Sequence, residues 1–99
     1  MTLNERLARC AVIGAAGKMG RGIALLLAQL CAEQGNCHLT LLDNNSDALE
    51  GLRSYLQTHL EKAEEKTGKQ GLAERALAAI RFSSSYTDCK GCRLVFEAA

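Results

Sequence analysis

A glycine-rich segment is the part of this 99-residue sequence whose residue types best suit ligand binding. It runs Gly14-Ala15-Ala16-Gly17-Lys18-Met19-Gly20 and lies between a short apolar run and a helix-like stretch. Without side chains beyond Cβ, the turn lets a diphosphate approach the backbone, and the N–H groups that open the helix point at the anion. Gly20, one turn into the helix, lets the helix lie close to the preceding strand. These seven residues are therefore candidate phosphate-binding positions, with Lys18 as a possible neutralising charge.

An acidic residue follows the next apolar run, at the position where a dinucleotide fold holds a ribose. Asp43 comes directly after His38–Leu42, which has the composition of a strand, and its carboxylate is suited to grip ribose hydroxyls. Asn44 and Asn45 come next, with no Arg to hold a 2′-phosphate, so the sequence favours NAD over NADP. The alternative is that the glycines serve only turn geometry and packing. Because the glycines, the helix start and Asp43 all fall at the positions that a dinucleotide-binding fold requires, nucleotide binding is favoured, with Asp43 as the ribose contact and Asn44 as a further candidate cofactor-binding residue.

The elements that must position these residues alternate between strand and helix patterns. We predict strands over 7–13, 38–42, 80–83 and 93–97, and helices over 17–33, 46–67 and 72–79. This order is expected of an α/β domain with a parallel sheet, and right-handed crossovers give the strand order 3-2-1-4. The predicted fold is the first half of a Rossmann-like doubly wound sheet, with a helical hairpin between the second and third strands.

Two of the predicted helices have distinct apolar patterns. The helix over 17–33 is apolar on most of its circumference, which predicts heavy burial of Met19, Ile23, Leu26, Leu27, Leu30 and Cys31. The helix over 46–67 is amphipathic, and its apolar residues fall in one arc: Leu49, Leu52, Leu56, Leu60 and Ala63. Asn45 or Ser46 is a suitable N-cap for this second helix, and Asp47 is favourably placed in its first turn.

Length and composition limit the classes of protein to consider. With 99 residues there is one domain, 1–99, and 47% hydrophobic with 23% charged residues are ordinary values for a globular chain. The net charge of +1 gives no strong field toward nucleic acid or anionic membranes, and four aromatic residues are too few for base-stacking platforms. Neither a nucleic acid nor a membrane is therefore an expected partner.

Cysteine usage indicates a reduced, cytoplasmic protein. The five cysteines are odd in number and irregularly spaced, which argues against a secreted disulfide framework. Cys89 and Cys92 form a CxxC pair that could be redox-active or half of a zinc site, but His38 and His59 do not complete a zinc ligand set. Free thiols are the favoured interpretation, and no metal is expected.

At this point the residues resemble a known family. The segment 12–24, the Leu-Leu-Asp ending at Asp43, the charged helical hairpin and the ending Val-Phe-Glu-Ala-Ala are similar to the NAD-binding domain of 3-hydroxyacyl-CoA dehydrogenases. The resemblance implies NAD as cofactor and, in the parent enzyme, hydride transfer between a 3-hydroxyacyl-CoA and NAD, as in fatty-acid oxidation. It also implies that Glu97 and Ala98 line the nicotinamide side of the cleft.

Two alternatives remain beside this resemblance. The loop is G-x-x-G-x-x-G, one residue longer than the family's usual G-x-G-x-x-G, and this longer form with Lys-Met-Gly is similar to dihydrodipicolinate reductase. The second alternative is a nucleotide-binding module without chemistry, since the family's catalytic His–Glu pair and polar Ser/Asn match positions beyond residue 99. We assign no catalytic residue in this chain, and expect it to be part of a longer enzyme.

The helical hairpin and the sheet edge suggest partners. Tyr55, His59, Lys62 and Lys66 form a stripe along one flank of the long helix. In the family this hairpin contacts coenzyme A, so His59, Lys62 and Lys66 are candidate contacts to the acyl-CoA substrate, although a solvated helix flank is favoured for any single residue. The fourth strand should have an unpaired edge and a bare apolar face, which predicts a homo-oligomer.

Overall fold

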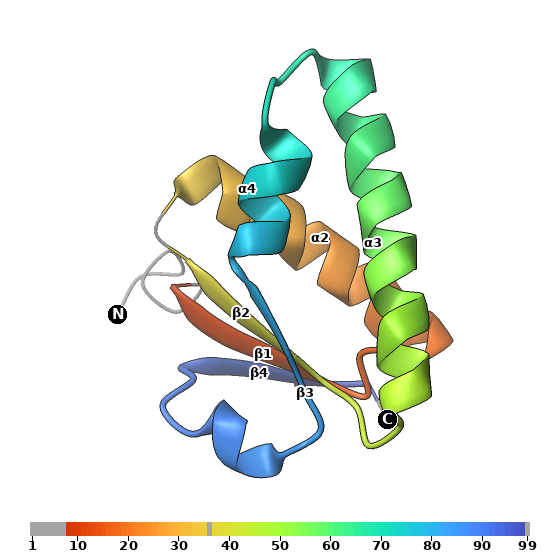
Figure 1. Cartoon of the computed structure of the whole chain (residues 1–99). Coiled ribbons are helices and arrows are strands. Elements are labelled where there is room, and N and C mark those ends of the chain that lie inside the picture. Colours follow the sequence, from red (N-terminus) through yellow and green to blue (C-terminus); the bar gives the residue numbers. More distant parts are fainter. Residues whose placement is uncertain (1–7, 36, 99) are drawn as a thin grey trace.

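The computed structural model describes residues 8–35 and 37–98, which form a parallel sheet with three α-helices on one side (Figure 1). In chain order, the elements are β1 (Arg9–Ile13), α2 (Lys18–Gln34), β2 (His38–Leu42), α3 (Ser46–Thr67), α4 (Leu72–Ala78), β3 (Ile80–Ser83), the 3₁₀ helix η1 (Tyr86–Cys89) and β4 (Leu94–Glu97). The strand order is β3-β2-β1-β4, so the predicted topology and the helical hairpin between the second and third strands are confirmed. Predicted and observed ends differ by at most two residues.

All strand pairs are parallel, and their register brings their carboxyl ends to the same edge of the sheet. Ile13 is level with Leu42 of β2 and with Glu97 of β4, and Leu42 is level with Ser83 of β3. The glycine-rich loop and Asp43 both follow strands that end at this level. The sheet therefore places the two sequence-predicted cofactor elements side by side.

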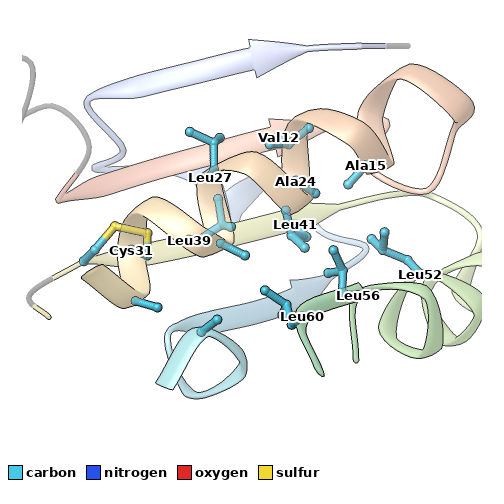
Figure 2. Close-up of a cluster of buried hydrophobic side chains, with 14 of the residues drawn as sticks. Val12, Ala15, Ala24, Leu27, Cys31, Leu39, Leu41, Leu52, Leu56 and Leu60 are labelled. Carbon is cyan, nitrogen blue, oxygen red and sulfur yellow. A yellow bond between two sulfur atoms is a disulfide. The ribbon is translucent and has the colours of Figure 1, made fainter. Parts of the chain in front are cut away.

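The core lies between the sheet and the three α-helices (Figure 2). Alternate residues of the central strands supply its floor, with Val12 from β1 and Leu41 from β2 fully buried. Helix α3 contributes the predicted leucine arc, of which Leu56 and Leu60 have no exposed surface. Burying one such side chain stabilises the fold by about 1.5–3 kcal/mol. The arc therefore explains why a helix as long as α3 is held against the sheet.

The prediction that the first helix is buried around most of its circumference was wrong. Met19 is 70% exposed and Leu26 is 59% exposed, although both belong to the apolar pattern of α2. The predicted burial of Leu27 and Cys31 is confirmed, and the other deeply buried residues of α2 are all small: Gly20, Ala24, Ala28 and Ala32. Since the sheet and the hairpin cover only part of the helix circumference, Met19 and Leu26 on the uncovered part remain in solvent.

The second face of the sheet is also less apolar than predicted. At its centre Ala11 and Leu42 are buried, whereas Arg81 and Glu97 at its borders are exposed. Val95 of β4 is the only large hydrophobic residue of a described strand that is markedly exposed, at 44%. The bare apolar face is therefore reduced to a patch beside the edge strand β4.

The cysteines correct the prediction of a fully reduced chain. Cys31 and Cys37 form a disulfide with a Cα–Cα distance of 5.0 Å. Helix α2 ends at a left-handed C-cap, Gly35 (φ 75°), and the turn returns the chain to the start of β2, which brings the two cysteines together. The other three, Cys10, Cys89 and Cys92, are free thiols.

Among the described residues, no helix is both long and apolar enough to span a membrane.

Candidate functional site

The glycine-rich loop is fixed to the end of β2 by its backbone. The N–H groups of Gly14 and Ala15 both donate to the carbonyl oxygen of Leu42, at 2.9 and 3.0 Å. Gly14 has a φ of 75°, a left-handed conformation that favours glycine, and its carbonyl oxygen accepts from the N–H of Gly17 at 3.2 Å. The loop therefore turns tightly over the carboxyl end of the sheet and leads directly into α2.

Gly20 is held so close to this loop that no side chain fits. A Cβ at this position would lie 2.1 Å from the carbonyl oxygen of Gly14 and 2.9 Å from the Cα of Ala15. By contrast, a Cβ at Gly22 would have no neighbour within 4 Å. The close approach at Gly20 brings the N-terminus of α2 against the end of β1.

The N-terminus of α2 has the properties of an anion-binding site. The helix begins at Lys18, and its first turn contains no acidic residue. The N–H of Arg21 donates to the carbonyl of Gly17 at 2.9 Å, so the N–H groups of Lys18, Met19 and Gly20 precede this bond and point out of the helix. Together with the positive end of the helix dipole, these three donors would stabilise a phosphate.

Asp43 has a structural role that the sequence did not indicate. Its Oδ2 accepts from the N–H of Ala16 at 3.1 Å, and its Oδ1 accepts from the N–H of Asn45 at 3.1 Å. The carboxylate thus joins the glycine-rich loop to the turn after β2. Each oxygen has a further lone pair, so the same carboxylate can also accept from the two hydroxyls of a ribose.

A cavity of about 360 Å³ lies where these elements meet. It is lined by Ile13, Gly14, Gly17, Leu42, Asp43, Asn44, Tyr86 and Ala98. Tyr86, on η1 after β3, was not among the sequence-predicted site residues and is 65% exposed. The one signal that could have found it is an aromatic residue that closely follows the carboxyl end of a strand at this edge of the sheet.

The remaining sequence-predicted cofactor residues border the cavity to different degrees. Ala98, just after β4, lines it, and its N–H donates to the carbonyl of Ile13 at 2.9 Å. Glu97 precedes it with an exposed side chain and does not itself line the cavity. Lys18 and Met19 are exposed at the start of α2. The last residue of the family-like ending, Ala99, lies outside the described residues.

The structure does not bring the predicted substrate residues of the hairpin to this cavity. His59 lies 13 residues after the start of α3, about 20 Å along the helix axis. Its ring contacts that of Tyr55, with a centroid distance of 4.3 Å, and the Arg21 guanidinium lies 5.0 Å from the Tyr55 ring centroid. Lys62 and Lys66 are exposed further along α3. These residues form a separate surface flank.

Cys89 lacks the lowered thiol pKa that a reactive cysteine of a redox CxxC pair needs. Partial burial raises the pKa of the Cys89 thiol, and the Cys92 thiol and the Asp88 carboxylate raise it further. Burial also raises the pKa of Cys10, to about 11, with an added contribution from Cys92. A reactive CxxC cysteine needs a lowered pKa, so the interpretation of Cys89 as a plain thiol fits its surroundings.

Comparison with known proteins gives a consistent result. Residues 9–99 match the family model described as 3-hydroxyacyl-CoA dehydrogenase, NAD binding domain. No curated protein sequence matches the chain. Among solved structures, (S)-3-hydroxybutyryl-CoA dehydrogenase PaaH1 from Ralstonia eutropha is 28% identical with a TM-score of 0.77, and M. tuberculosis FadB2 is 27% identical with a TM-score of 0.76.

A diketoreductase is similar at 28% identity, with a TM-score of 0.74, and is matched over 91% of this chain. The PaaH1 and FadB2 structures are each matched over 94% of this chain. In all three cases the chain spans only 31% of the other protein's length. The likeness therefore concerns one region of each of these proteins.

Proposed function

The chain belongs to the 3-hydroxyacyl-CoA dehydrogenase family, as an NAD-binding domain, and on this premise we propose that NAD occupies the 360 Å³ cavity at the carboxyl ends of the strands. The proposal rests on one observation: the glycine-rich loop, the N-terminus of α2 and the Asp43 carboxylate all border the same cavity. The family match also favours the dehydrogenase interpretation over dihydrodipicolinate reductase.

We assign the adenosine half of the cofactor to the β2 and β3 side of the cavity. The Asp43 carboxylate would accept hydrogen bonds from the adenosine ribose hydroxyls, and Asn44 would donate a hydrogen bond to the ribose or accept one from it. The phenol ring of Tyr86 would stack against the adenine, since it lines the same cavity and is exposed enough to be covered by a base. Gly14 and Gly17, with Ala15 and Ala16 between them, would leave room for the pyrophosphate.

The pyrophosphate and the nicotinamide would lie on the β1 and β4 side of the cavity. The N–H groups of Lys18, Met19 and Gly20 would bind the pyrophosphate oxygens, because they open α2 and face no acidic side chain in its first turn. Ala98 and Glu97, at the end of β4, would border the nicotinamide side. The cofactor would then cross the sheet edge from β3 to β4.

The reaction proposed for the whole protein is reversible hydride transfer between C3 of a 3-hydroxyacyl-CoA and NAD. In the oxidative direction, the C3–H bond breaks and its hydride passes to the nicotinamide, while the hydroxyl proton passes to a base. Bound NAD supplies the hydride acceptor, and this chain's own residues bind and orient it. No residue of this chain is assigned the role of the base. A neighbouring structure is named a hydroxybutyryl-CoA dehydrogenase, which supports an acyl-CoA substrate.

The hairpin is the proposed contact for the substrate's coenzyme A. Lys62 and Lys66 are exposed on α3, and His59 is half-buried on the same flank against Tyr55. Two ammonium groups one turn apart would attract the CoA phosphates. Their distance from the cofactor cavity fits a long substrate whose reacting end is remote from its nucleotide.

We also propose that the protein forms a homo-oligomer and works in the cytoplasm. The described strands leave one edge of β4 without a partner strand, beside the exposed Val95, and such an edge favours association with a second copy. The cytoplasmic location is supported by the three free thiols Cys10, Cys89 and Cys92.

Titration of the chain with NADH tests the cofactor assignment. The protein has no Trp, so the fluorescence of bound NADH is measured with little protein background. We expect saturable binding, and weaker binding of NADPH by at least about tenfold, because its 2′-phosphate would face the Asp43 carboxylate. Equal affinity for NADPH would overturn the ribose assignment, and no binding at millimolar NADH would overturn the site.

A further inference from the structure

Three cysteines meet in the core at the end of the sheet opposite to the cofactor cavity. The sulfurs of Cys10 on β1, Cys31 on α2 and Cys37 just before β2 all lie within 4.8 Å of one another. Cys10, Cys31 and Cys37 are 0%, 3% and 6% exposed, respectively. Figure 2 shows the Cys31–Cys37 disulfide beside the end of β2 that lies away from the glycine-rich loop. Neither the NAD site nor the family match assigns a role to this cluster.

We propose that, once the Cys31–Cys37 disulfide is reduced, the three sulfurs bind one soft monovalent cation of the Cu(I) type. Thiolates bound to a common metal at about 2.3 Å lie about 4 Å apart. The sulfur of Cys10 already lies within 4.8 Å of the other two, and the sulfurs of Cys31 and Cys37, which are bonded to each other in the disulfide, would move apart to about 4 Å after reduction. Cu(I) prefers soft sulfur ligands. Structural zinc would need a fourth ligand, and among the described residues the cluster contains no fourth Cys, His, Asp or Glu.

The surroundings provide access and a compensating charge. A cavity of about 260 Å³ is lined by Cys31 and Cys37 together with His38 and Arg75, so the ion has a route to the sulfurs. A trigonal thiolate site carries net negative charge, and Arg75, a lining residue of this cavity whose guanidinium donates to the carbonyl of Gln70 at 2.8 Å, is the cationic residue that would partly offset it. The sulfur of Cys10 also donates to the carbonyl of His38 at 3.9 Å, which orients it toward this end of β2.

The disulfide and the metal site are two states of the same sulfurs. A dithiol reductant transfers two electrons and two protons to the Cys31–Cys37 bond and is itself oxidised to a disulfide, which leaves three thiols with Cys10. Cu(I) then forms three Cu–S bonds and displaces the thiol protons to solvent. Oxidation therefore excludes the metal, and bound metal prevents the disulfide from forming.

Anaerobic competition between the full chain and a Cu(I) chelator, bathocuproine disulfonate, tests this proposal. The Cys89→Ser/Cys92→Ser background removes the CxxC pair, which could bind Cu(I) by itself. In the reduced background protein we expect one equivalent of Cu(I), and X-ray absorption should show three sulfur neighbours. The same protein with the disulfide intact should bind at least about 100-fold more weakly, and this control requires no change of core residue.

A second variant identifies the third ligand. Cys10→Ala in the same background should weaken Cu(I) binding about 100-fold, with the helical circular dichroism measured to verify folding. Cu(I) binding that is equally tight with the disulfide intact would overturn the proposal. So would a reduced background protein that fails to compete with the chelator, or a folded Cys10→Ala variant with unchanged affinity.

Discussion

Asp43 shows how one side chain can serve both the fold and the ligand. Its two oxygens hold the N–H groups of Ala16 and Asn45, and both hydrogen bonds lie at the rim of the proposed cofactor cavity. Its position after a strand was sufficient to predict a ribose contact. The bond to Ala16 could not be predicted, because it depends on how far the loop after β1 folds over the end of β2.

Asp43→Asn should weaken NADH binding by about 10- to 100-fold. The amide has one accepting oxygen in place of two and carries no charge, so a charge-assisted hydrogen bond of about 1.5–3 kcal/mol is lost. Asp47→Asn makes the same change in charge nearby, at an exposed residue of α3 that does not line the cavity. NADH titration of both variants checks this, and equal losses in the two would contradict a direct role for Asp43.

Cys89 should react slowly with iodoacetamide at pH 7. Its pKa is raised above the usual 9.0, first by burial, so the thiolate fraction at neutral pH is lower than in a free cysteine, and the alkylation rate should rise to its plateau only above pH 9. Trypsin cleaves at Lys90, so mass spectrometry can follow Cys89 and Cys92 on separate peptides. Cys92→Ser should lower the pKa and speed the reaction. A rate faster than that of a model peptide would indicate a redox-type cysteine.

Other residues of the site show where inference from sequence ends. Gly14, Gly17 and Gly20 were predicted because only glycine suits a turn and a close approach of this kind. Tyr86 was not, because an exposed aromatic residue in a polar segment has no spacing that links it to a loop some 70 residues earlier. The Cys31–Cys37 disulfide was likewise missed, since it depends on the turn at Gly35 after α2.

At the scale of elements, the start of α2 depends on its contact with the loop after β1. Gly20→Ala should destabilise the protein by about 3 kcal/mol, because the new Cβ would overlap the carbonyl oxygen of Gly14 and force the loop to move. It should also abolish detectable NADH binding. The measurements are urea unfolding and NADH fluorescence.

Gly22→Ala is the matched control two residues later on the same helix. Its Cβ would enter open space, so the substitution should stabilise the helix by about 0.5–1 kcal/mol and leave NADH binding unchanged. If both alanine variants proved equally stable, the close approach at Gly20 would not be the feature that fixes the loop.

The periodic elements were the easiest to predict. The bounds of α3 and its leucine arc follow from three- and four-residue spacing, and the Asn45 side chain caps the helix by accepting from the N–H groups of Asp47 and Ala48. The burial of α2 was harder, because its pattern is apolar almost all round. Which flank is covered depends on where the hairpin packs, and a single helix does not encode that information.

At the scale of the whole molecule, the sheet is asymmetric: its three α-helices cover one face, and β4 is the edge strand on one side (Figure 1). Val95→Lys should shift the protein toward the monomer in sedimentation velocity experiments, because a lysine on an edge strand opposes pairing with a second copy. Leu26→Lys is the control, since it places the same charge at an exposed apolar residue on α2. If Leu26→Lys shifted the protein toward the monomer and Val95→Lys did not, the interface would lie on the helices.

The hydrogen bond from Ala16 to Asp43 means that the protein's own residues hold the glycine-rich loop in place at the cavity. The loop would then lose little conformational entropy when NAD binds, and the binding free energy is not reduced by the cost of ordering it. The amide proton of Ala16 also becomes an internal reporter. Its hydrogen exchange in the cofactor-free protein should be slow, should accelerate in Asp43→Asn, and should measure how often the loop leaves the sheet before any ligand arrives.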